Sequence, residues 1–372
     1  MTNIQPSAEA RIDLPGMLPE ELSLLVADMG EPAYRADQLF SWIHEKDTPE
    51  ISAMTDLPAT FREELARRTN GIGLKRISER QSTKDGTAKF LFEVAGAGFV
   101  ESVLIREGGR RTACLSSQVG CPLDCKFCAT GRMGLKANLS AAQILDQLRH
   151  LNQHAMAEGG ERVTNVVMMG MGEPLLNYDN LVRALRLMKL KGKSGIGGRR
   201  ITVSTAGYVP GIRKLMDEDL NVGLAISLNA TTDASREQIM PINRKFKIDS
   251  LLAAAKDYFD KRGRRVTLEY VLLDRLNDTD DDARRLSQLT RGLTCKINLI
   301  PYNELSLGSE GADVPTFRRP PRQRVDQFTQ LLQRLSKNTI TLRESKGRDI
   351  DAACGQLFHE KGPLVTAPDK ER

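Results

Sequence analysis

The stretch GCPLDCKFCATG, residues 120–131, places three cysteines within eight positions of a chain that has six in all. Cys121, Cys125 and Cys128 have the spacing C-x3-C-x2-C. Thiolates that lie this close bind zinc or an iron-sulfur cluster. Structural zinc needs four ligands, so Cys114 would have to complete the site across an unusual six-residue gap. Three cysteines alone suit a 4Fe-4S cluster with one iron open to a small ligand, and an open iron indicates chemistry.

The segments around the cysteines alternate between short apolar strands and amphipathic helices, and from residue 112 the alternation repeats about six times. Repeated strand-helix units predict a parallel sheet, and six of them favour a full or partial barrel. A doubly wound open sheet is the competing arrangement. The expected strands are 112–116, 163–170, 200–205, 221–228, 265–273, 296–302 and 339–344, and the expected helices are 140–157, 178–190, 248–262, 279–293 and 321–337.

Two further regions precede this alternation. Residues 16–69 have apolar residues at helical spacing with Pro and Gly between the segments, which predicts a small helical domain. Residues 87–105 nearly alternate around a Gly-rich turn and predict a hairpin. The fold class is therefore α/β, a partial (βα)6 barrel of TIM type with a small N-terminal helical domain and a β-hairpin extension. The expected divisions are 1–85 (helical, RNA-contacting), 86–111 (β extension), 112–345 (barrel core) and 346–372 (C-terminal segment), with a mobile loop at 303–322 and disorder at 361–372.

Composition sets the protein class. Hydrophobic residues are 40% and charged residues 27%, as in ordinary globular proteins. No apolar run approaches the roughly 18 residues of a membrane helix, and no signal region is visible, so we expect a cytoplasmic protein without membrane contact. Thiols stay reduced in that compartment, which favours metal binding over structural disulfides.

The net charge of +6 is unevenly distributed. Residues 1–70 have 13 acidic and 6 basic side chains, which leaves +13 for the remainder. A positive field attracts polyanions, of which nucleic acid is the commonest, although solvated Lys and Arg on helix faces explain any single cluster equally well. The candidate stretches for phosphate contact are 189–200, 244–247, 261–265 and 318–324.

Polar and glycine residues follow several of the expected strands. Chemistry in barrels takes place at the carboxyl ends of the strands. Each such residue alone reads as a turn or a cap, but their coincidence at one edge indicates a site. They are Gly172 and Glu173 after the second strand, Ser204 at the third, Ser227 and Asn229 at the fourth, and Asn303 after the sixth.

The cysteine motif, with Phe127 before its last cysteine, resembles the signature of the radical S-adenosylmethionine (SAM) superfamily. Longer stretches resemble, in the same order, the RlmN family of dual-specificity RNA methyltransferases: FCATGRMGLKANLSAAQILDQ, MGMGEPLLNYDN, SLNATTDASREQIMPINRKF, EYVLLDRLNDTDDDARRL and RDIDAACGQL. The resemblance implies one 4Fe-4S cluster on the three cysteines of the motif. It also implies SAM contacts from Gly172, Glu173, Ser204, Ser227, Leu228, Asn229 and Asn303. Family members often have His at the position of Asn229, where an amide can still bond a ribose hydroxyl.

The same resemblance implies a reaction. It assigns Cys354 as an S-methylated cysteine, Cys114 as the thiol that later forms a disulfide with it, and Glu101 as the base. Two SAM molecules per turnover would methylate C2 of adenosine 2503 in 23S rRNA and adenosine 37 in tRNA. A cellular electron donor and a disulfide reductant would assist a monomeric enzyme. Because only a thiolate attacks usefully, we expect Cys114 in a site that favours ionisation.

Two alternatives stay open. The C8-methylating enzymes of the same superfamily share the cluster motif and the DIDAACGQL ending. A non-catalytic RNA-binding protein with a structural metal site would also contain clustered cysteines and a basic surface. Cys295 matches no motif and reads as a core residue.

Overall fold

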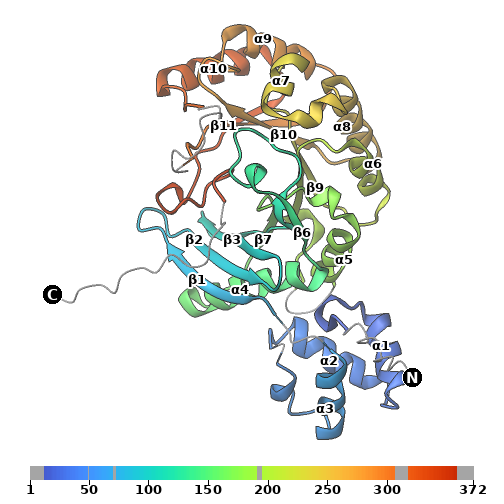
Figure 1. Cartoon of the computed structure of the whole chain (residues 1–372). Helices are drawn as coiled ribbons and strands as arrows, with labels where there is room; N and C mark the ends of the chain where they lie inside the picture. Colours follow the sequence, from blue (N-terminus) through green and yellow to red (C-terminus); the bar gives the residue numbers. More distant parts are fainter. Residues whose placement is uncertain (1–11, 49, 70–72, 191–194, 306–316, 358–372) are drawn as a thin grey trace, which may run out of the picture. The chain divides into compact units, whose positions relative to one another are not determined.

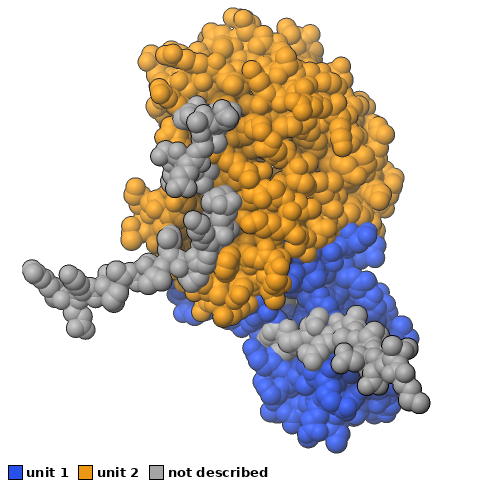
Figure 2. All heavy atoms as spheres, viewed as in Figure 1, with its two compact units in different colours: residues 1–74, 139–162, 179–196 blue, residues 75–138, 163–178, 197–372 orange. Residues whose placement is uncertain are grey.

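The computed structural model describes residues 12–48, 50–69, 73–190, 195–305 and 317–357 (Figure 1). The chain divides into two compact units, coloured separately in Figure 2. The first comprises residues 1–74, 139–162 and 179–196, and the second comprises 75–138, 163–178 and 197–372. The four-part division expected from the sequence stays a prediction.

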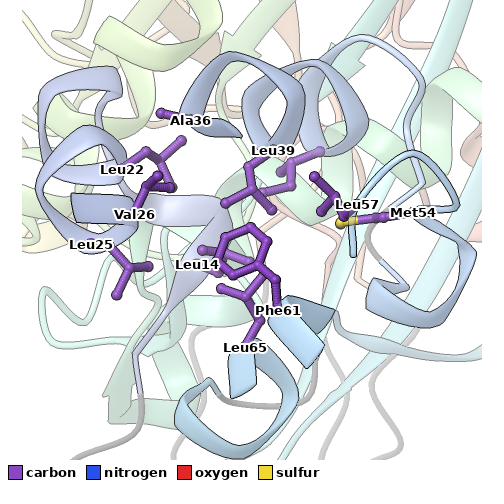
Figure 3. Close-up of a cluster of buried hydrophobic side chains, with 11 residues drawn as sticks. Leu14, Leu22, Leu25, Val26, Ala36, Leu39, Met54, Leu57, Phe61 and Leu65 are labelled. Atoms are coloured by element: carbon purple, nitrogen blue, oxygen red, sulfur yellow. The ribbon is translucent and has the colours of Figure 1, made fainter. Parts of the chain in front are cut away.

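The first unit is helical. Apolar residues three and four positions apart on its helices, such as Leu22 with Val26 and Phe61 with Leu65, meet in one buried core that also includes Leu14 (Figure 3). Ser140 and Gln143 form a capping box at a helix start, since Ser140 Oγ accepts from the Gln143 N–H and Gln143 Oε1 accepts from the Ser140 N–H. The helices of the first unit are α1 (Pro19–Asp28), α2 (Tyr34–His44), α3 (Ala59–Arg68), α4 (Ala141–Gly159) and α5 (Tyr178–Lys189).

A ten-stranded sheet forms the second unit, in the order β1-β2-β3-β4-β7-β8-β9-β10-β11-β12. Strands β1 to β4 pair antiparallel, and from β4 to β12 every pair is parallel. The parallel strands follow chain order without reversal, so the barrel prediction is confirmed and the doubly wound alternative is wrong. The bounds are β1 (Lys75–Gln81), β2 (Ala88–Val94), β3 (Gly98–Glu107), β4 (Arg110–Cys114), β7 (Asn165–Met168), β8 (Ile201–Thr205), β9 (Gly223–Ser227), β10 (Val266–Leu272), β11 (Cys295–Pro301) and β12 (Thr339–Leu342).

The barrel is partial. Within the described residues, the sheet order runs from β1 to β12 and no pairing joins these two ends. Helices α6 (Val209–Asp217), α8 (Ile248–Arg262), α9 (Asp280–Leu289) and α10 (Arg322–Leu335) lie outside the strands of this unit, together with the short α7 (Asp233–Ile239) (Figure 1).

Several elements were not expected from the sequence. Strand β1 is polar and mostly exposed, so it has no apolar alternation. Helices α6 and α7 are short, and β5 (Gln118–Cys121) and β6 (Gly134–Asn138) form a separate two-stranded sheet around the cysteine motif. Part of the loop expected at 303–322 and all of the tail expected at 361–372 lie outside the described residues. Where the chain is described, none of its helices has the length and apolarity needed to cross a membrane.

Candidate active site

A cavity of about 160 Å³ lies at the carboxyl ends of the parallel strands of the second unit. Its lining residues extend along the sequence from Cys121 to Gly355. Leu228, Glu101 and Cys114 are not among its lining residues. Those of the expected site residues that do line it are Cys121, Cys125, Cys128, Gly172, Glu173, Ser204, Ser227, Asn229, Asn303 and Cys354.

The cysteine motif forms a tight loop after β5. The Cys128 N–H donates to the Cys125 carbonyl at 3.0 Å. Two glycines allow the loop to close: a Cβ on Gly131 would lie 2.9 Å from the Cys125 carbonyl oxygen, and one on Gly120, where φ is +74°, would collide with the backbone of Gly134. Backbone packing therefore fixes the positions from which the thiols face the cavity.

The three thiols of the motif influence one another. Burial raises the pKa of Cys121 to about 12. The pKa of Cys125 is also raised, chiefly by burial and to a smaller extent by the neighbouring thiols of Cys128 and Cys121. Three thiols of this kind ionise readily only when a cationic group binds among them. The donor set therefore suits a metal cofactor.

The arrangement of the thiols bears on which metal group they suit. Among the described residues, no three His, Cys, Asp or Glu side chains converge as ligands of one metal ion. Cys114, which would complete a zinc site, lines a different cavity. Zinc needs four ligands around one point, whereas each cysteine of a 4Fe-4S cluster binds a different iron. The residues present fit the cluster better than zinc.

Two buried oxygen atoms in residues that line the cavity lack a hydrogen-bond partner within the described part of the chain. They are Asn303 Oδ1 and Glu269 Oε2. Buried polar atoms are nearly always paired, so unpaired ones beside a cavity indicate a polar ligand such as SAM. Sequence reasoning missed Glu269. A carboxylate inside an otherwise apolar strand segment, EYVLL, was the available signal.

Gly172 and Glu173 form the turn after β7. Gly172 has φ of +97°, where side chains are unfavourable. The Glu173 carboxylate accepts from the Leu175 N–H at 3.1 Å and from the Ala206 N–H at 2.7 Å, which joins this turn to the end of β8. Burial raises the pKa of Glu173 to about 7, and these hydrogen bonds oppose the rise. A cationic ligand in the cavity would favour its ionised form.

This pKa predicts a pH effect on the cofactor-free protein. The pKa of Glu173 in the folded protein, about 7, lies above the ordinary 4.5 of this carboxyl in the unfolded chain, so between these pH values the chain takes up a proton on folding. The stabilising contribution is complete below about pH 4.5 and is lost as the pH rises through 7. We expect wild-type protein to lose on the order of 3 kcal/mol of unfolding free energy relative to Glu173→Gln between pH 5 and pH 8. Denaturant titrations at both pH values measure this, and parallel pH profiles of the two proteins would contradict it.

Leu228 and Asn229, which follow β9, both make hydrogen bonds within the fold. Asn229 has φ of +57°, its Oδ1 accepts from the Val271 N–H at 2.8 Å, and its Nδ2 donates to Met240 Sδ at 3.3 Å. Its side-chain amide is thus engaged within the fold. Leu228 is fully buried, and its N–H donates to the Glu269 carbonyl at 3.0 Å. Contacts of Leu228 and Asn229 with SAM stay a prediction.

The C-terminal segment brings Cys354 to the cavity. The Ala129 N–H donates to the Gly355 carbonyl at 2.8 Å, and Thr130 Oγ1 donates to the Leu357 carbonyl at 2.6 Å. Asn303 Nδ2 donates to the Cys354 carbonyl at 3.2 Å. These contacts attach the segment to the cysteine loop and to the end of β11.

Cys114 faces a second, smaller cavity of about 20 Å³, which Cys354 also lines. The expectation that its site favours ionisation is wrong. Burial at the end of β4 raises the pKa of Cys114 to about 12, and Cys354 adds to the rise, while Arg343 opposes it. The sequence shows a cysteine in a strand but not how completely the strand end is covered.

Glu101 lies in β3 and is only 3% exposed. Its Oε1 pairs with Lys89 Nζ at 3.1 Å, and the same ammonium donates to the Asp351 carbonyl at 3.1 Å. Glu101 is thus connected to the C-terminal segment through Lys89. It lines neither cavity described above.

Comparisons with known proteins agree with this geometry. The family model of the radical SAM superfamily matches residues 115–286, and that of the ribosomal RNA large subunit methyltransferase N-terminal domain matches residues 12–70. The chain is similar to a probable dual-specificity RNA methyltransferase RlmN of Symbiobacterium thermophilum, at 44% identity over 93% of this chain and 91% of the relative. It is equally similar, at 44% over 94% and 93%, to the dual-specificity RNA methyltransferase RlmN of Anaeromyxobacter dehalogenans.

A solved structure is also similar over almost the whole chain. The crystal structure of a radical SAM methyltransferase from Sphaerobacter thermophilus matches with a TM-score of 0.87 and 42% identity, over 93% of this chain and 99% of that one. Radical SAM proteins use a 4Fe-4S cluster and SAM, for which the cavity provides thiols and unpaired polar atoms. The chain belongs to the RlmN family of dual-specificity RNA methyltransferases, within the radical SAM superfamily.

Proposed function

We propose that the protein methylates C2 of adenine, at adenosine 2503 of 23S rRNA and adenosine 37 of tRNA, with Cys354 as the carrier of the transferred carbon. One observation carries the proposal: Cys354 lines both the cavity of the three motif cysteines and the cavity of Cys114. A carrier thiol has to meet the methyl donor on one side and a resolving thiol on the other. The position of Cys354 satisfies both needs.

Adenine C2 explains why a carrier is needed. It lies between two ring nitrogens, is electron-poor and cannot attack the methyl of SAM as a nucleophile. When bound, the cluster and two SAM molecules per turnover supply the methyl group and the radical chemistry that makes it reactive. Cys121, Cys125 and Cys128 would hold the cluster. The residues that would bind SAM are Gly172, Glu173, Ser204, Ser227, Leu228, Asn229 and Asn303.

Release of the product is the task of Cys114. Its thiolate attacks Cys354 Sγ, an S–S bond forms, and the bond from Cys354 Sγ to the transferred carbon breaks. The bonding electrons leave with the carbon, which takes a proton and becomes the methyl group. Glu101 is the proposed acceptor of the C2 proton, for which its ion pair with Lys89 has to open. A cellular reductant then reduces the Cys114–Cys354 disulfide. A cellular electron donor supplies electrons to the cluster. We propose that the enzyme acts as a monomer.

Locating the methyl group tests this function. We expect anaerobically reconstituted protein with SAM, an electron donor and either RNA to give 2-methyladenosine on digestion, measured by chromatography with mass spectrometry. Cys114→Ala cannot break the bond between Cys354 and the carbon, so it should accumulate a covalent RNA-protein adduct. Methylation at C8 would assign the chain to the C8-methylating enzymes of the same superfamily. RNA binding without methylation would identify a non-catalytic RNA-binding protein.

A further inference from the structure

The two cavities share part of their lining. The large cavity and the small one have three lining residues in common, Met169, Arg343 and Cys354. Arg343 is the one among them with a permanent charge, because a guanidinium stays protonated in proteins. It therefore lies beside the proposed carrier thiol and faces the cavity of Cys114 as well.

The backbone around Arg343 is held on both sides. Arg343 directly follows β12, and its N–H donates to the Leu299 carbonyl of β11 at 2.9 Å. The next residue, Glu344, pairs with Arg319 and Arg322, each at 2.9 Å. Ser345 Oγ accepts from Asn303 Nδ2 at 2.9 Å. The guanidinium thus starts from a fixed point of the barrel rather than from a loose tail.

In contrast to its neighbour Glu344, the side chain of Arg343 has no partner among the residues that the structure describes. Within the described residues no carboxylate oxygen lies within 4.0 Å of its guanidinium, and its side chain makes no hydrogen bond. The pKa of Arg343 is raised chiefly by its electrostatic interaction with Cys354, then with Glu269, Cys114 and Glu107, while burial opposes the rise. Arg343 is partly buried, and no carboxylate pairs with its guanidinium in the described part of the chain, so its charge remains available to an anion that forms beside it during function.

We propose that Arg343 is a positioning residue that stabilises the Cys114 thiolate for its attack on the Cys354 sulfur. This inference rests on the proposed roles of the two thiols and adds the group that makes their exchange possible. Arg343 touches no substrate in this role, since it acts through Cys114.

The electrostatics of the small cavity support this role. Burial alone leaves Cys114 with few thiolates at neutral pH, because its pKa is about 12. Arg343 is the charged side chain that opposes the rise, while Cys354 adds to it. Lys346 also lines the cavity. Glu269 on β10 and Glu107 on β3 act on Arg343 from the neighbouring strands. Without Arg343 the pKa of Cys114 would be set chiefly by burial and by Cys354, which both raise it.

Disulfide closure in the full-length holoprotein tests the inference without methyl transfer. The probe is 2-hydroxyethyl disulfide under anaerobic conditions, which oxidises the two thiols and releases two molecules of 2-mercaptoethanol. The rate of Cys114–Cys354 disulfide formation is followed by acid quenching and peptide mass spectrometry between pH 6.5 and 9.5. We expect Arg343→Met to slow closure by about tenfold at pH 8, since an opposite charge shifts a neighbouring pKa by one unit or more.

Two variants serve as controls. Arg343→Lys keeps the charge, so its closure rate and pH midpoint should stay within about threefold and half a unit of wild type. If Arg343→Met does not fold, the closure rate of Arg343→Lys still tests whether the charge at this position stabilises the Cys114 thiolate. Lys346→Met removes a cation from the small cavity alone and should change the rate less than twofold.

Three outcomes overturn the inference. Closure of Arg343→Met at the wild-type rate shows that the thiolate does not depend on Arg343. Loss of SAM or RNA affinity in Arg343→Met, with closure unchanged, assigns the guanidinium to a ligand carboxylate or phosphate instead. If wild-type protein itself forms no Cys114–Cys354 disulfide, the thiol pair of the proposed function fails, and the inference fails with it.

Discussion

Cys354→Ala is expected to lose methyl transfer to RNA by at least about a thousandfold, the range in which removal of a covalent nucleophile falls. The substitution removes the sulfur that would carry the carbon, and in the described part of the chain no other thiol lines both cavities. Its neighbours keep their contacts, since the hydrogen bonds of this segment to Asn303 and Ala129 use backbone carbonyls. Iron content, SAM binding and thermal unfolding should therefore resemble wild type while single-turnover methylation disappears.

Cys295→Ala is the matched control. Cys295 begins β11, is 1% exposed and lines neither cavity. Truncating a buried cysteine leaves a small void and costs about 1 kcal/mol of unfolding free energy. Methylation should continue near the wild-type rate. Methylation by Cys354→Ala at the wild-type rate would reject the carrier role, and RNA binding without methylation in both proteins would favour the RNA-binding alternative.

The parallel part of the barrel was predictable because its strands are covered on both faces. Strands β10 and β11 are almost entirely buried and read as continuous apolar segments. The polar strand β1 has no such pattern, since most of its side chains are exposed. The sheet of β5 and β6 shifts register beside Gly120, so its alternation is broken where it supports the cysteine loop. The local pattern of apolar residues does not predict a strand whose formation depends on tertiary contacts.

The site was predictable where it follows a strand end and not where it depends on burial. Gly172, Ser204 and Asn303 follow that rule and line one cavity. Glu269 and Arg343 were missed because both lie inside the strands expected at 265–273 and 339–344, whereas β12 already ends at Leu342. Which residues of a strand line the cavity depends on tertiary packing and does not follow from spacing. The raised pKa of Cys114 has the same origin in tertiary packing.

Gly172→Ala is expected to have the second large effect, on stability and on SAM binding together. A Cβ at Gly172 would lie 2.5 Å from Gln118 Cβ and 2.9 Å from the Gln118 backbone nitrogen. Gln118 cannot easily move away, because it is 1% exposed, its Oε1 accepts from the Glu173 N–H at 2.8 Å and its Nε2 donates to Asn138 Oδ1 at 2.8 Å. The clash would therefore displace β5, which ends in Cys121, and the turn that contains Glu173.

The cost of Gly172→Ala has two parts, and a second glycine separates them. A side chain at positive φ costs about 1 kcal/mol, and forcing extra volume into a packed site adds about 1–3 kcal/mol. Gly263, in the same unit, has φ of +62° with no atom within 4 Å of the added Cβ, so Gly263→Ala incurs only the first part. We expect denaturant unfolding to show the larger loss for Gly172→Ala, and calorimetry to show SAM binding weakened by about tenfold or more in that variant alone. If both variants lose the same stability and bind SAM equally, the close packing of this turn against β5 does not position the cofactor.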